Sequence, residues 1–157
     1  MKTKIFTGID GLELIVNSRK SAVIFEMNHN QMNNKCSVTY NFEIKDFIEL
    51  YKYVEIISNE SWDNFTPKEA NSLGADYYEY YDREHDNNGY FYLREDILKI
   101  DRPLLESNKL YQFNKRKMES FIYDLKKIGR QRNISPDKIS LLVEMKNKIS
   151  EYNNKEV

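Results

Sequence analysis

The sequence predicts an α+β fold, with an antiparallel sheet of about five to seven strands and two or three helices packed on one face. Three observations support it. Short apolar or alternating runs fill the first forty residues, longer segments with helical apolar spacing follow, and turn-forming residues separate the segments. The 157 residues, 40% of them hydrophobic, suit a single globular domain over 1–152 with a frayed tail over 153–157.

The N-terminal part of the chain carries three expected strands. Residues 12–16 and 22–27 are apolar runs with a polar segment between them. Residues 36–42 alternate, so that every second residue from Val38 to Phe42 shares one face. This alternation is typical of a strand with one buried face.

Two helical signals follow these strands. Apolar residues recur every three or four positions over about 43–58, which predicts an amphipathic helix. Residues 66–69 (TPKE) have the form of a capping box with proline at the first helical position. They predict a short helix that ends near Gly74.

The C-terminal half repeats the change from strands to helix. Strands are expected over 77–84 and 89–100, joined by the turn signal DNNG at 86–89, and over 109–113. A helix is expected over 115–128, because Asn114 is a good N-cap and Gly129 a good terminator. The cap SPD at 135–137 predicts a third helix over about 136–152.

An internal similarity links the two halves. Residues 40–57 align without gaps to 111–128, and each copy is a strand that turns directly into a core-facing helix. The alignment indicates two pseudo-repeats, over 12–58 and 77–128. The alternative is chance, because any amphipathic strand followed by a helix has this pattern.

The pseudo-repeats resemble PUR-type repeats, in which an antiparallel sheet is followed by a helix. The resemblance rests on element order and apolar spacing. It implies binding of single-stranded nucleic acid on the sheet through aromatic and basic residues. The first copy, however, carries acidic residues where a nucleic-acid-binding protein would prefer basic ones.

Charge is unevenly distributed along the chain. Residues 1–100 hold 11 basic and 17 acidic side chains, a formal charge of −6, whereas residues 101–157 hold 13 and 8, a charge of +5. The asymmetry indicates either two separate binding faces or two halves that neutralise each other in the folded protein.

No pattern of residues predicts catalysis. The sequence lacks phosphate-loop, dinucleotide, zinc-protease and Cys-x-x-Cys motifs. His29 and His85 lie far apart in sequence near expected turns, and Cys36 is the single cysteine. No run approaches the roughly 20 apolar residues of a membrane span. We therefore expect a cytoplasmic protein without enzymatic activity, cofactor or metal.

The segment 76–86 (DYYEYYDREHD) is the first candidate partner surface. Tyrosine supplies rigid amphipathic contact area, and the acidic residues around it would suit a basic partner. The alternative is an amphipathic strand whose tyrosines lie partly in the core. The residues expected to bind a partner are Tyr77, Tyr78, Glu79, Tyr80, Tyr81, Asp82 and Glu84.

The second candidate is the basic triplet Lys115, Arg116 and Lys117. These residues occupy the first turn of an expected helix, where the macrodipole disfavours cations by about 0.3–1 kcal/mol each. Helix stability therefore does not explain them, and an anion site at the helix start does. The alternatives are solvated side chains or pairing with the protein's own acidic strand.

These observations favour a non-enzymatic protein-binding module, such as an inhibitor or immunity factor encoded by a bacterium or a phage. The expected partner is another protein, with a basic surface facing the acidic tyrosine segment. The alternative is a single-stranded nucleic-acid-binding domain of PUR-like type. Membrane binding is not expected.

Overall fold

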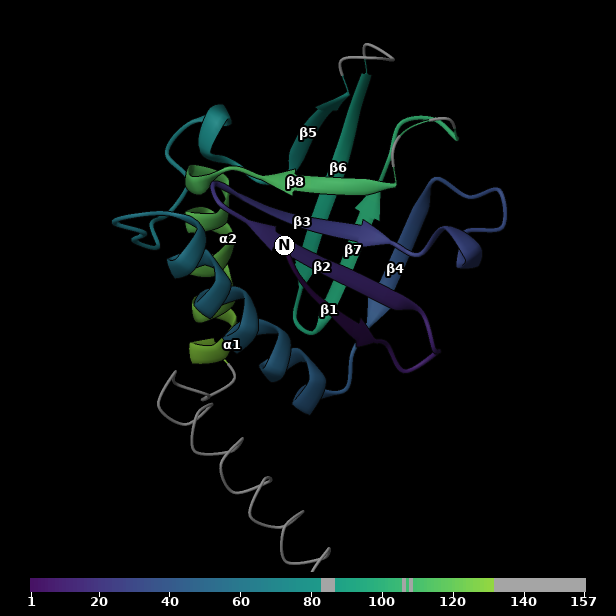
Figure 1. The fold of residues 1–157 in the computed structure, drawn as a ribbon, viewed down its shortest axis with the longest axis horizontal. Helices are drawn as coiled ribbons and strands as arrows, with labels where there is room; N and C mark the ends of the chain where they lie inside the picture. Colours follow the sequence, from purple (N-terminus) through teal and green to yellow (C-terminus); the bar gives the residue numbers. More distant parts are fainter. Residues whose placement is uncertain (83–86, 106, 108, 132–157) are drawn as a thin grey trace, which may run out of the picture.

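The computed structural model describes residues 1–131 apart from 83–86, 106 and 108, and it describes the backbone alone at 73, 80–82, 87, 130 and 131 (Figure 1). The predicted helix over 136–152 and the tail over 153–157 therefore lie outside the described residues. The predicted α+β class with antiparallel strands is confirmed. Among the described residues the strands number eight and form two sheets.

The two sheets are antiparallel and have four strands each. Sheet A has the order β1 (Lys2–Thr7), β2 (Glu13–Arg19), β3 (Ala22–Met27) and β8 (Leu110–Phe113). Sheet B has the order β4 (Ser37–Asn41), β7 (Ile97–Asp101), β6 (Asn87–Arg94) and β5 (Glu79–Asp82). In Figure 1 the strands of sheet A pass in front of those of sheet B and cross them steeply.

Two α-helices lie beside each other at one side of the sheets (Figure 1). Helix α1 (Ile44–Ser61) packs on β1, β2 and β3, and helix α2 (Lys115–Gln131) packs on β8 and on α1. Two short 3₁₀ helices, η1 (His29–Gln31) and η2 (Leu73–Ala75), lie in the connections. The helices thus complete a core that the sheets enclose.

The centre of the core is aromatic. Phe121 of α2 lies with its ring centroid 5.3 Å from those of Phe91 in β6 and Phe113 in β8, and 5.8 Å from that of Phe25 in β3. All four side chains are fully buried. The tilted and edge-on rings join both sheets and one helix, which confirms the predicted buried stripe of α2.

The halves of the chain have the same element order, four strands followed by a helix, and they exchange their fourth strands. Strand β4 pairs with β7 of the second half, and β8 pairs with β3 of the first. Tyr40 lies opposite Leu98, and its aligned counterpart Tyr111 lies opposite Phe25. The aligned tyrosines therefore hold equivalent places, each beside the third strand of the other half.

The short helix predicted to begin at residue 66 is wrong, because residues 65–71 form neither helix nor strand. The backbone N–H of Thr66 donates to the carboxylate of Glu119 in α2 at 2.8 Å, and that of Lys68 to the Glu119 carbonyl at 3.2 Å. In a capping box the Glu69 side chain would accept from the Thr66 N–H. Here the Glu119 carboxylate of α2 accepts from that N–H instead.

The strands differ from the sequence prediction in three respects. Strand β1 was not expected, because lysines interrupt its apolar residues. The strand predicted over 89–100 is two, β6 and β7, with a turn at which Glu95 takes a positive φ of 55°. Strand β6 begins at Asn87, so the β5–β6 connection precedes most of the predicted DNNG turn.

Candidate functional site

The predicted partner segment divides between core and surface. Tyr77 is only 2% exposed, its ring packs on Phe91 and Phe121, and its hydroxyl donates to Asp124 Oδ2 at 2.7 Å. Burial above all, and the bond to Asp124, raise the pKa of Tyr77 well above the usual range. The prediction that Tyr77 contacts a partner is therefore wrong, because the core already uses both its ring and its hydroxyl.

The neighbouring residues of that segment remain candidates. Tyr78 is 45% exposed and Glu79 is exposed. For Tyr80, Tyr81 and Asp82 the structure describes only the backbone in β5, where Tyr81 pairs with Asn88, and Glu84 lies outside the described residues. Tyr78 and Glu79 are thus the two predicted contacts whose side chains are known to be accessible.

A second group of tyrosines occupies the solvent side of sheet B. Tyr92 of β6 is 45% exposed, and its ring lies stacked 6.2 Å from that of Tyr90, two residues earlier on the same strand. Lys99 of β7 lies opposite Tyr92, with Nζ 5.6 Å from the ring centroid. We call this surface the tyrosine face; it comprises Glu79, Tyr90, Tyr92, Arg94, Lys99 and Asp101.

Pairing across the strands explains the composition of the tyrosine face. Phe91 points into the core, so its neighbours Tyr90 and Tyr92 point to the other side of the sheet. Tyr90 lies between Glu79 of β5 and Asp101 of β7. The face is therefore acidic around Tyr90 and basic around Tyr92, and its four charged residues sum to zero.

Sequence reasoning missed this surface although the signal was present. The segment Tyr90-Phe91-Tyr92 was expected to be a strand, and its alternation already implied that the two tyrosines would share a face. The higher density of tyrosines in segment 76–86 favoured that segment instead. Density alone does not decide which side of a sheet a tyrosine occupies.

The basic triplet does not form one anion site. Arg116 donates to the backbone carbonyls of Lys68 at 3.2 Å and Glu69 at 2.5 Å. Lys117 donates to the carbonyl of Glu79 in β5 at 3.0 Å, and burial lowers its pKa. Lys115 differs, because it lines a cavity and has no polar partner for its side chain among the described residues.

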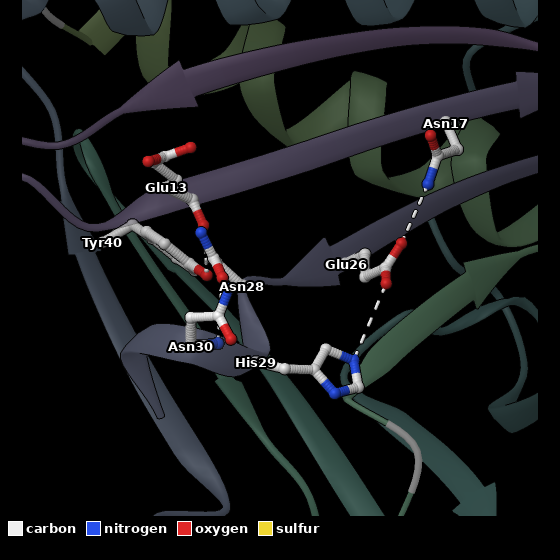
Figure 2. A network of polar contacts seen from close by, with 7 residues as sticks. All are labelled: Glu13, Asn17, Glu26, Asn28, His29, Asn30 and Tyr40. Atoms are coloured by element: carbon white, nitrogen blue, oxygen red, sulfur yellow. Dashed lines mark hydrogen bonds and ion pairs between the residues drawn. The ribbon is translucent and has the colours of Figure 1, made fainter. Parts of the chain in front are cut away.

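Figure 2 shows a polar network on the outer side of sheet A that includes His29. Glu26 of β3 accepts from Asn17 Nδ2 at 3.1 Å, and His29 Nε2 lies 3.7 Å from its other carboxylate oxygen. Tyr40 of β4 donates to the Glu13 carbonyl at 3.1 Å and so ties the two sheets. The imidazole is two-thirds exposed, which is typical of a solvated surface pair.

Other chemistry-bearing groups give no further site within the part of the chain that the structure describes. No three His, Cys, Asp or Glu side chains there converge as metal ligands would. Cys36 is half-buried and lies one residue before β4. None of the described helices has the length and apolar character needed to cross a bilayer.

No family model, curated protein sequence or solved structure matches this chain.

Proposed function

We propose that this protein is a non-enzymatic binding module that engages another protein through the tyrosine face. The observation that carries the proposal is the stacked pair of the half-buried Tyr90 and the exposed Tyr92 on the solvent side of sheet B. The tyrosines lie on a central strand that is paired on both sides, so the scaffold beneath them is rigid. A rigid aromatic surface loses little conformational entropy when it binds.

Removal of the tyrosine rings from water would favour binding. A tyrosine ring left 45% exposed in the free protein gains favourable burial when a partner covers it. The Lys99 ammonium lies over the Tyr92 ring, so the ring also makes a cation–π contact within the face. Tyrosines at the centre of an interface, surrounded by charged residues at the rim, have the arrangement in which binding energy concentrates on the aromatic residues.

The partner's chemistry follows from the two ends of the face. Basic groups of the partner would meet Glu79 and Asp101, and acidic groups would meet Arg94 and Lys99. The expected basic surface of the partner therefore suits the acidic end of the tyrosine face, beside β5. Strand β5 itself belongs to segment 76–86. A protein of this kind would act as an inhibitor or immunity factor, of bacterial or phage origin.

The test begins with capture of a partner from lysate by the full-length protein, followed by measurement of the Kd for the purified pair. Tyr92→Ala is expected to weaken binding by about tenfold or more, since truncated aromatic anchors cost about 2 kcal/mol or more. Ile56→Ala is the matched control, because Ile56 is an exposed apolar residue of α1 away from sheet B. Equal affinity of the parent and Tyr92→Ala would remove the tyrosine face from the interface.

Single-stranded nucleic acid is the second candidate ligand. Stacked tyrosines beside Lys99 and Arg94 have the chemistry on which bases stack and phosphates pair, and each half of the chain shows the strand-then-helix order of the PUR-type resemblance. The zero net charge of the face favours a protein instead, since nucleic-acid binding depends on an excess of cations. Fluorescence anisotropy with labelled oligonucleotides at low and high salt distinguishes the two.

A further inference from the structure

A cavity of about 560 Å³ lies away from the tyrosine face, between the β2–β3 turn, the C-terminal end of α1 and the first residue of α2. The first two residues of the chain line it as well, so its walls come from four segments that are distant in sequence. Cavities of a few hundred cubic ångströms are the size that small-molecule ligands occupy.

Two serine residues with little exposed surface line this cavity. Ser18 of β2 is 5% exposed, and Ser61 at the end of α1 is 7% exposed. Neither Oγ has a hydrogen-bond partner among the described residues, although the serine hydroxyl is both a donor and an acceptor. Hydroxyl groups at the wall of a cavity can donate hydrogen bonds to the oxygen atoms of a bound ligand.

The charged residues of the cavity leave an excess of cations. Lys2 is bound to Glu60 at 2.7 Å, so this pair is neutral. The remaining cationic side chains are those of Arg19 at the end of β2, Lys20 in the β2–β3 turn and Lys115 in α2, and none of the three has a side-chain polar partner in the described part of the chain. Asp63 is the remaining carboxylate of the lining. The site therefore carries an excess of about two positive charges near neutral pH.

Local structure holds these groups in place. Ser21, at the β2–β3 turn, has a positive φ of 65°, and its N–H donates to the Ser61 carbonyl at 2.9 Å. This bond fixes the turn that carries Arg19 and Lys20 against the end of α1. Asn114 caps α2 through a bond from the Lys117 N–H at 2.8 Å, so Lys115 lies in the first helical turn with the macrodipole's positive end beside it.

We propose that this cavity binds the phosphate group of a small phosphate monoester. Such a group carries about −1.5 to −2 charges near pH 7 and three acceptor oxygens, which complement the excess positive charge and the donors that surround the site. The cavity is larger than a phosphate ion needs. The additional space, bordered by Trp62 and Asp63, would receive the organic part of the ligand.

The experiment is an NMR titration of the isotope-labelled full-length protein with inorganic phosphate, ribose 5-phosphate and adenosine 5′-monophosphate at constant ionic strength. Saturable shifts are expected at the amides of Ser18, Ser61 and Lys115. At least one monoester should bind about tenfold more tightly than inorganic phosphate, because its organic part adds contacts.

Variants test the assignment of residues. Lys115→Ala and Arg19→Ala should each weaken the best monoester by about tenfold, as expected for loss of a charge-assisted hydrogen bond. Ser61→Ala should weaken it while leaving the fold intact, because its Oγ has no hydrogen-bond partner among the residues that the structure describes. Lys127→Ala is the matched control, since Lys127 is an exposed lysine of α2 outside the cavity. Lys20→Ala replaces any variant that fails to fold.

Three results would overturn the proposal. The first is the absence of saturable shifts at about 10 mM monoester, which would correspond to negligible affinity. The second is inorganic phosphate binding as tightly as every monoester. The third is a single-stranded oligonucleotide that binds the same amides more tightly than the monoesters do.

Discussion

Gly89 lies where the backbone of β6 passes closest to the end of β7. A Cβ at this position would come within 2.8 Å of the Asp101 carbonyl oxygen and 3.0 Å of Arg102 Nη1. The carbonyl belongs to a paired strand, so it cannot move without disturbing the ladder. Glycine is therefore required here by close approach of the backbone and not by turn geometry.

Gly89→Ala is expected to lower the free energy of unfolding by about 1–3 kcal/mol, the usual cost of forcing atoms into a packed site. Gly74→Ala is the matched control, because the nearest atom to its Cβ would be Ser72 Oγ at 4.0 Å. Urea denaturation of the two variants measures the difference. Equal stability of the two would show that β7 yields to the added methyl group.

Tyr77 predicts a specific loss of stability in alkali. Its pKa is raised in the folded protein by burial and by the hydrogen bond to Asp124, whereas the unfolded chain has the ordinary tyrosine pKa of about 10. Below pH 10 both states keep the proton. Above it only the unfolded state loses it, so the free energy of unfolding falls as the pH rises.

Tyr77→Phe should flatten this alkaline slope, at the cost of about 1 kcal/mol for the lost hydrogen bond near neutral pH. Tyr78→Phe is the control, because Tyr78 is half exposed and lies next in sequence. The measurement is urea denaturation at several pH values between 8 and 11. A slope unchanged in Tyr77→Phe would mean that other groups, such as the buried Tyr40, whose pKa is also raised by burial, cause it.

At the scale of elements, the first turn of α2 serves two purposes. Arg116 and Lys117 bind the carbonyls of segment 68–69 and of β5, so they fasten the connection between the halves to the helix. Lys115 makes no such bond and faces the cavity. Cations at the unfavourable end of the helix are thus explained by tertiary hydrogen bonds for two residues and by the proposed ligand for the third.

Alanine variants of this turn should separate the two purposes. Arg116→Ala and Lys117→Ala are each expected to cost about 0.5–1.5 kcal/mol of stability through lost hydrogen bonds. Lys115→Ala should be neutral or stabilise the free protein by about 0.3–1 kcal/mol, because it removes a cation from the positive helix end. Urea denaturation decides this, and a destabilised Lys115→Ala would reveal an internal partner.

Helix α2 also supplies the central core residue. Phe121→Ala is expected to cost about 3–5 kcal/mol, as for other buried aromatic residues. Its ring contacts come from Phe25, Tyr77, Phe91 and Phe113, so the cavity left behind would border both sheets. Lys127→Ala on the exposed side of the same helix is the control, and thermal or urea denaturation the measurement. A Phe121→Ala protein with parental stability would mean that the core can collapse into the gap.

At the scale of the whole molecule, strand exchange makes the halves interdependent. Strand β3 of the first half pairs with β8 of the second, and β7 of the second pairs with β4 of the first. Each half alone would therefore lose one strand of its sheet. Phe25 of the first half has its ring partners Phe91, Phe113 and Phe121 in the second. The core is therefore shared between the halves and not duplicated.

Fragments 1–65 and 66–157 should accordingly be unfolded when separate and should form a folded one-to-one complex when mixed. An isolated half exposes most of the aromatic core, and its remaining strands cannot cover it. Amide NMR spectra of each fragment and of the mixture provide the measurement. A well-dispersed spectrum from 1–65 alone would show that β4 can find another partner within its own half.

The sequence by itself determined the local elements and the class of fold. Alternation over residues 36–42 and helical spacing over 43–58 and 115–128 correspond to β4, α1 and α2 within a few residues. Such periodicities arise from the geometry of a single strand or helix, so neighbouring residues suffice to reveal them. The alignment of 40–57 with 111–128 likewise anticipated the equivalent places of β4 and β8.

Tertiary structure alone decided the sheets and the surfaces. Which strand pairs with which depends on contacts between residues far apart in sequence, so the exchange of β4 and β8 and the division into two sheets were not visible in local pattern. The positions of Tyr77 and Arg116 were not visible in local pattern for the same reason. A buried tyrosine and an interface tyrosine have the same sequence signal. Only the fold brings Asp124 within hydrogen-bond distance of Tyr77, and a backbone carbonyl within that distance of Arg116.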